Sequence, residues 1–226
     1  MPAYSQYIEQ LPKSMREMFS AGGMIDFSTP VGYFNAELFS FMLPLLLIVF
    51  GIGFGAAAIA GDEEKGTLGF LLANPVPRWR VVVDKFGALT VTMILLGSTF
   101  WLGLTICIIG IGIDINLIKL AEATIGSIAL ALVFSAISFF VGCYKGNRSM
   151  SLGIASGLAV LTYFLNVLGG MVSGLKNYRF LSPFYQYMQP NTLVNGLDLH
   201  ILVLAGLIVL FFAISIPAFI RRDITV

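Results

Sequence analysis

The segment GDEEKGTLGFLLANPVPRWRVVVDK, residues 61–85, carries charges of both signs between two long apolar runs. Residues 38–61 before it and residues 86–113 after it contain no Asp, Glu, Lys, Arg or His. A helix needs about 20 mostly apolar residues to cross a bilayer, and both runs are long enough. The segment between them is therefore predicted to lie in water at one side of a membrane.

The composition of the whole chain supports a membrane protein. Of its 226 residues 58% are hydrophobic and 11% are charged, whereas soluble domains carry about 25% charged residues. We therefore expect an all-α, polytopic membrane protein with one membrane domain. The net charge of +1 argues against a nucleic-acid partner, because such proteins present a basic surface.

Apolar runs along the chain predict the membrane crossings. Five of them are long enough to span a bilayer: residues 38–61, 86–113, 123–144, 149–175 and 201–220. Lys and Arg are concentrated in the 61–85 and 145–150 connections and at the C-terminus, which predicts that these parts are cytoplasmic. Residues 1–33 are expected to form an extracytoplasmic segment with a short amphipathic helix, and residues 34–226 the transmembrane domain.

The first half of the 61–85 segment has the pattern of a short amphipathic helix. Three acidic residues suit the positive end of a helix dipole in its first turn: Asp62, Glu63 and Glu64. Three leucines then fall at i, i+3 and i+4 on one face: Leu68, Leu71 and Leu72. Pro75 and Pro77 end the helix, because proline lacks the amide hydrogen. An exposed leucine face predicts a partner that covers it.

Several catalytic chemistries lack their residues in this chain. It has no G-x-x-x-x-G-K-[ST], H-E-x-x-H, C-x-x-C or G-x-S-x-G pattern, and His200 is its single histidine. Cys107 and Cys143 are expected to be small packing residues. Because the five runs hold no charged residue, a carrier driven by an ion gradient is also disfavoured. We predict that the chain is not an enzyme, needs no cofactor of its own and binds no metal.

Small residues in the runs predict where helices approach closely. Three pairs have the G-x-x-x-G spacing: Gly51 with Gly55, Gly153 with Gly157, and Gly170 with Gly174. A chain with 24 glycines also produces such spacings by chance, so we expect only some of them to mark a close crossing. Aromatic residues between 176 and 200 predict short interfacial helices in an aromatic belt: Tyr178, Phe184, Tyr185 and Tyr187.

Residues 61–68, GDEEKGTL, and 71–78, LLANPVPR, closely resemble the first cytoplasmic loop of ABC type-2 exporter permeases. Residues 182–184, SPF, and 219–223, FIRRD, are similar to further parts of that family's pattern. The resemblance implies that the loop holds a coupling helix, which docks on a separate ABC ATP-binding subunit. The docking residues that it implies are Asp62, Glu63, Glu64, Gly66, Thr67, Leu68, Leu71, Leu72, Pro75 and Arg78.

The resemblance also sets an expectation for the complex. ATP and Mg²⁺ would be bound by the ATPase partner, and a second permease subunit, identical or related, would complete the path through a prokaryotic plasma membrane. Members of the family usually have six helices, and the first of them is missing here. A misplaced start or a truncation, a five-helix variant, and a helix supplied by another polypeptide would each explain this, and we favour the first.

The predicted function is therefore the permease subunit of an ATP-driven exporter, with its C-terminus in the cytoplasm. One alternative is a membrane interaction protein without transport, such as an immunity or scaffold subunit. Another is a membrane enzyme that acts on lipid, which would have to use the carboxylates at 62–64 without a neighbouring histidine. The substrate is not readable from the sequence, although the absence of buried charge favours a hydrophobic or amphipathic cargo over a small ion.

Overall fold

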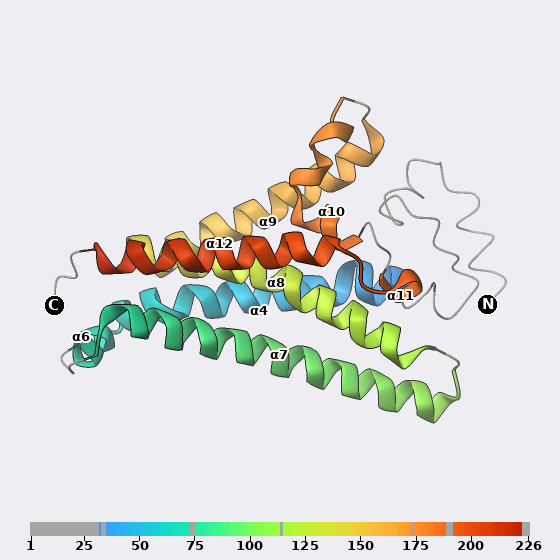
Figure 1. Ribbon diagram of the computed structural model, residues 1–226, viewed down its shortest axis with the longest axis horizontal. Coiled ribbons are helices and arrows are strands. Elements are labelled where there is room, and N and C mark those ends of the chain that lie inside the picture. Colours follow the sequence, from blue (N-terminus) through green and yellow to red (C-terminus); the bar gives the residue numbers. More distant parts are fainter. Residues whose placement is uncertain are drawn as a thin grey trace.

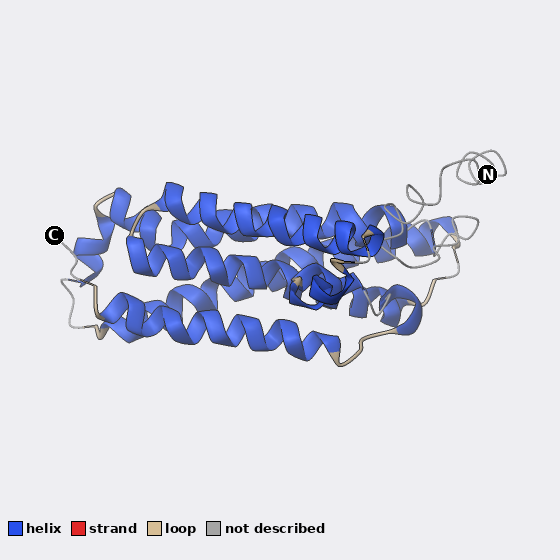
Figure 2. Ribbon diagram, turned by 90° about the horizontal axis from the view of Figure 1, so that it is seen from above, coloured by secondary structure: helices blue, strands red, loops and turns tan. Residues whose placement is uncertain are grey.

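The computed structural model describes Gly32 and residues 35–222, except for residues 73–75, 114, 173 and 189–191. Long helices lie side by side along its long axis (Figures 1 and 2), and the described residues contain no strand. Among the described residues, five helices are long and apolar enough to cross a membrane. The predicted all-α, polytopic architecture is therefore confirmed. The predicted segment 1–33 lies outside the described residues apart from Gly32.

The first crossing is a composite helix and the other four are continuous. It consists of η1 (Asn35–Met42), α4 (Leu43–Ala56) and η2 (Ala57–Gly61), of which η1 and η2 are π-helical. The continuous crossings are α7 (Arg78–Ile111), α8 (Leu117–Lys145), α9 (Arg148–Met171) and α12 (His200–Ile220). α7 and α8 begin earlier than residues 86 and 123, and α9 ends before residue 175. The apolar runs did not predict where α7 and α8 begin, because each helix extends beyond its apolar stretch into charged residues. In α7 these include Arg80 and Asp84, which pair at 3.8 Å.

α8 is the centre of the bundle. It packs against α4, α7, α9 and α12. In the most apolar 18-residue stretch of α8, 83% of the residues are buried, compared with 11% in the corresponding stretches of α7 and α12. The outer helices therefore expose apolar side chains, as expected where lipid replaces water. Asn116 caps the start of α8 by accepting hydrogen bonds from the amides of Ile118 (3.0 Å) and Lys119 (3.3 Å).

Gly51 and Gly55 let α4 cross α8 closely. A Cβ atom on Gly55 would lie 2.5 Å from the carbonyl oxygen of Ser135, and one on Gly51 would overlap the Ser135 hydroxyl. The Ser138 hydroxyl donates a hydrogen bond to the carbonyl of Ile52 at 2.9 Å across this crossing. This G-x-x-x-G pair marks a close approach, as predicted.

The other two G-x-x-x-G pairs mark no close helix crossing among the residues that the structure describes. A Cβ atom on Gly153, Gly157 or Gly174 would meet nothing within 4 Å. Near Gly170 the closest atoms belong to the Arg179 side chain rather than to another helix. The spacing alone could not distinguish these pairs from Gly51 and Gly55, because it does not say which face of the helix is covered.

Between α9 and α12 the described residues form three short helices, as the sequence predicted. They are η3 (Lys176–Leu181), α10 (Pro183–Met188) and α11 (Thr192–Asn195). α10 and α11 lie toward the end of the bundle opposite α6 (Thr67–Leu72), as Figure 1 shows. We refer to the end with α6 as the loop end and to the end with α10 as the distal end.

The predicted aromatic belt at the distal end is wrong for two of its residues. Phe184 and Tyr187 are buried, each with 7% exposure, whereas Tyr178 is 58% exposed. The Tyr187 hydroxyl donates to the carbonyl of Phe39 at 2.6 Å and hydrogen-bonds the Ser127 hydroxyl at 2.7 Å. Burial raises the pKa of the Tyr187 phenol above its usual value. α10 is therefore packed into the bundle and is anchored to two of its helices.

Candidate functional site

The segment that resembles the family's coupling loop folds into two short helices. α5 (Asp62–Glu64) continues the first crossing, and α6 follows after a turn at Lys65 and Gly66. Gly66 has φ 70°, a left-handed conformation that glycine adopts without steric cost. The Thr67 hydroxyl donates to the carbonyl of Asp62 at 3.0 Å, which holds the start of α6 against α5. The single helix predicted from the sequence is therefore divided at Gly66.

The three carboxylates of α5 contact three different transmembrane helices or their ends. Asp62 forms an ion pair with Lys85 of α7, and Glu63 forms one with Arg222, just after α12. Glu64 accepts a hydrogen bond from the backbone amide of Arg148 at 3.1 Å. Arg148 is the first residue of α9, so the Glu64 carboxylate lies where a helix dipole favours negative charge.

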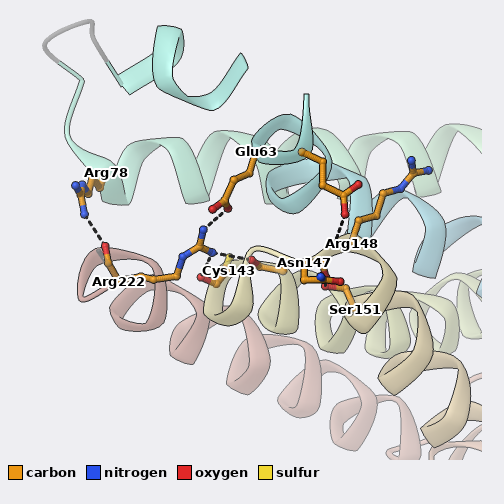
Figure 3. A network of polar contacts seen from close by, with 9 residues as sticks. Glu63, Arg78, Cys143, Asn147, Arg148, Ser151 and Arg222 are labelled. Carbon is orange, nitrogen blue, oxygen red and sulfur yellow. Dashed lines mark hydrogen bonds and ion pairs between the residues drawn. The ribbon is translucent and has the colours of Figure 1, made fainter. Parts of the chain in front are cut away.

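Arg222 joins most of this network (Figure 3). Besides its ion pair with Glu63, its Nη1 donates to the carbonyls of Gly142 at 3.2 Å and Cys143 at 3.1 Å. Both carbonyls belong to the last turn of α8, and the carbonyl of Gly142 also accepts a hydrogen bond from the amide of Gly146 at 2.9 Å. The carbonyl of Arg222 in turn accepts a hydrogen bond from Arg78 Nη1 at 3.0 Å. The charged network, which comprises Asp62, Glu63, Glu64, Arg78, Lys85, Arg148 and Arg222, thus connects α5 to α7, α8, α9 and α12.

The network also depends on a tight turn between α8 and α9. Gly146 has φ 66° and ends α8, and the Asn147 side chain accepts a hydrogen bond from the amide of Met150 at 2.8 Å to begin α9. Two residues therefore reverse the chain. The turn brings the amide of Arg148 to Glu64 and the last carbonyls of α8 to Arg222.

Leu68 does not lie where the sequence predicted. Its side chain is 2% exposed and belongs to the hydrophobic core of the chain, so the prediction of a surface position for Leu68 is wrong. The amphipathic stripe at 68, 71 and 72 predicted one common face, but the first leucine of the stripe is buried by the protein itself. Gly66 and Thr67 are exposed and Arg78 is half-buried.

The remaining predicted docking residues are only partly described. Leu71 and Leu72 form the end of α6, but their side chains lie outside the described part of the chain, as does Pro75. Their docking role stays a prediction. Sequence reasoning missed the partners of the carboxylates, because pairing depends on which helix ends meet in space. Arg222 was visible only as part of the closing FIRRD sequence, and Arg148 only as a basic residue in a short connection.

The described residues contain no group of three or more His, Cys, Asp or Glu side chains that could hold a metal ion. Cys143 is buried within α8 and Cys107 is exposed on α7. The described residues of the loop end form ion pairs and hydrogen bonds to the backbone.

Comparison with known proteins identifies the family. The profile of the ABC-2 family transporter protein matches residues 1–224. This chain belongs to the ABC-2 transporter family. It is also similar to the probable ABC transporter permease protein NosY of Stutzerimonas stutzeri, with 27% identity over 144 residues. That match covers 61% of this chain and 51% of the relative, so it spans about half the length of NosY.

The family and the helices together establish the general role. This ABC-2 family protein is a membrane-embedded, multi-pass protein. The resemblance predicted from residues 61–85 is confirmed at the level of the family.

Proposed function

We propose that this ABC-2 permease couples ATP hydrolysis by a separate ATP-binding subunit to the export of a substrate across the plasma membrane of a prokaryotic cell. The loop end would be cytoplasmic, because Arg78, Lys85, Arg148 and Arg222 gather there and basic residues favour the cytoplasmic side. ATP and Mg²⁺ would be held by the ATP-binding subunit. A second permease subunit, either a copy or a relative, would complete the path.

The observation that carries this proposal is the way α5 and α6 are connected to the rest of the bundle. The carboxylates of α5 bind partners on α7, α9 and the end of α12, and Arg222 extends the network to α8. A displacement of α6 by a bound subunit would therefore reach all of these helices together. A loop that only joined two helix ends would not need contacts with the other three.

The burial and pairing of the loop residues support a smaller contact surface for the ATP-binding subunit than the sequence predicted. Leu68 is buried and would anchor α6 to the bundle. The carboxylates have partners within the chain, so they would position the loop rather than bind the other subunit. The contact surface would then comprise the exposed Gly66 and Thr67 together with Leu71, Leu72 and Pro75.

Co-purification tests the proposal. The tagged chain would be extracted from its native membrane in mild detergent, and the eluate would be assayed for an ATP-binding subunit by mass spectrometry. We expect the subunit at about one copy per permease. A wild-type preparation without any ATPase would contradict the coupling proposal and would favour an interaction protein without transport.

Two variants locate the contact. Leu71→Asp places a charge in the proposed contact surface, and we expect it to remove most of the bound ATPase while the membrane level of the permease stays unchanged. Leu71→Met nearly conserves volume and polarity and should retain the ATPase. If Leu71→Asp retains it as well, the docking surface lies elsewhere.

A further inference from the structure

Arg179, at the distal end, turns back along α9. It belongs to η3, and its Nη2 donates to the side-chain oxygen of Asn166 at 3.3 Å. Gly169 and Gly170 make room for it, because a Cβ atom on Gly169 would lie 3.0 Å from Arg179 Cδ and one on Gly170 would lie 3.7 Å from its Cζ. The Cζ atom lies 5.2 Å from the centroid of the Tyr185 ring. The side chain is therefore held by α9 on one side and by an aromatic ring of α10 on another.

This arrangement brings a charge to the end of an apolar span. Asn166 is 1% exposed and lies inside the candidate membrane span Arg148–Gly170. It precedes the end of α9 at Met171 by about 7.5 Å, at 1.5 Å per residue. The sequence places no charged residue in any of the five apolar runs, yet the fold brings a guanidinium to one of them. A guanidinium beside the end of an apolar span is costly without a polar partner.

The guanidinium lacks a counter-ion in the part of the chain that the structure describes. No ion pair is formed by Arg179 there, and its buried Nε has no hydrogen-bond partner. Arginine stays charged and offers five N–H donors, of which Asn166 accepts one. The Tyr185 ring offsets only part of the charge. Donors therefore remain for an anion.

The surroundings indicate what kind of anion would bind. Tyr178, Phe180 and Leu181 of the same η3 segment are 58%, 62% and 59% exposed. Aromatic and aliphatic side chains beside a cation at a helix end fit the region where lipid headgroups meet acyl chains. A guanidinium binds phosphate oxygens in a bidentate manner.

We propose that Arg179, with Asn166 and Tyr185, forms a binding site for a phosphate-bearing anion, supplied by the headgroup of an anionic phospholipid. The phosphate would bind the Nη N–H groups of Arg179 that Asn166 leaves free, and the acyl chains would lie on Phe180 and Leu181. The site is separate from the charged network at the loop end and does not depend on the docking of an ATP-binding subunit.

Native mass spectrometry of the purified permease with added phosphatidylglycerol tests the site. Arg179→Gln removes the charge and keeps an amide donor for Asn166, and we expect it to weaken retention of one lipid about tenfold, the effect of losing a charge-assisted hydrogen bond. Lys176→Gln, an exposed cation in the same η3 segment, is the matched control and should change retention by less than about twofold.

A second variant tests the site without deleting the arginine. Asn166→Asp is nearly isosteric and supplies Arg179 with an internal carboxylate, so it should displace the lipid as strongly as Arg179→Gln does. A thermal shift measured with inorganic phosphate in lipid-free detergent distinguishes the source. If phosphate stabilises the wild type but neither variant, the site takes a soluble anion, whereas stabilisation by phosphatidylglycerol alone supports a lipid. Retention of phosphatidylglycerol at the wild-type level by both variants would overturn the proposal.

Discussion

Arg222 and Glu63, 159 positions apart in the sequence, form an ion pair at the loop end of the bundle. Their side chains are 14% and 29% exposed, so solvent screens the pair only in part. Because Arg222 also binds the last carbonyls of α8, the pair joins the start of the coupling loop to two helix ends. Arg222, just after α12, is thus part of the same unit as residues 61–85.

The first prediction concerns this pair. We expect Glu63→Gln and Arg222→Gln each to lower the free energy of unfolding in detergent by about 1 kcal/mol, the upper range for partly exposed pairs. The double variant should cost less than the sum, because both single changes remove one interaction. Arg221→Gln, an exposed neighbour, serves as the control and should be close to neutral. If the two losses of free energy add exactly in the double variant, the ion pair contributes nothing to the stability of the folded chain.

The second prediction concerns the crossing of α4 and α8. Gly55→Ala puts a Cβ atom 2.5 Å from a backbone oxygen, so the helices must separate, and we expect a loss of about 1–3 kcal/mol of stability. Gly157→Ala adds the same atom where nothing lies within 4 Å and should be neutral or slightly stabilising, because alanine favours helix. Thermal unfolding of the two variants in one detergent measures the difference. Equal stability would mean that the crossing is loose.

The helices and the family were predictable because hydrophobicity along the chain is a local property. Twenty or so apolar residues cross a bilayer whatever their neighbours are, and residues 61–78 form one continuous pattern. The ends of α7 and α8 were harder to place, because a helix persists beyond the bilayer where charged residues such as Arg80 and Asp84 stabilise it.

The direction of individual side chains was not predictable, because it depends on the packing of distant segments. Leu68 has the surface pattern of its neighbours but is buried, and Tyr187 is buried because Phe39 and Ser127 offer it partners. Arg179 follows the apolar span in sequence and reaches back to it through a turn. In each case the deciding contact lies in another helix.

The third prediction concerns the anchor of α10. Tyr187→Phe removes the hydroxyl that bonds Phe39 and Ser127 and leaves a buried carbonyl without this donor. We expect a cost of about 1–3 kcal/mol, measured by thermal unfolding. Tyr178→Phe, the same change at an exposed tyrosine, should have almost no effect. Equal values for the two variants would contradict an anchoring role for the hydroxyl.

A pH dependence follows from the same residue. Burial raises the folded-state pKa of Tyr187 above its ordinary value of 10.0, so the unfolded chain loses this proton first. The stability that the protonated Tyr187 phenol contributes to the folded chain is fully present below pH 10. It is lost as the pH rises from there through the folded-state pKa. Unfolding measured across this alkaline range should show a steeper loss of stability for the wild type than for Tyr187→Phe. Parallel curves would mean that the phenol ionises as easily in the folded chain as in the unfolded chain.

The last prediction concerns the turn between α5 and α6. Gly66 has φ 70°, and a Cβ atom there would meet nothing within 4 Å, so any effect of substitution comes from the backbone conformation alone. Gly66→Ala should cost about 1 kcal/mol, whereas Gly66→Asn should cost less, because asparagine tolerates the left-handed region. If α6 carries the ATP-binding subunit as proposed, the alanine variant should also co-purify with less of it than the asparagine variant. A normal amount with Gly66→Ala, together with unchanged stability, would show that the turn need not be held in this conformation for α6 to be presented.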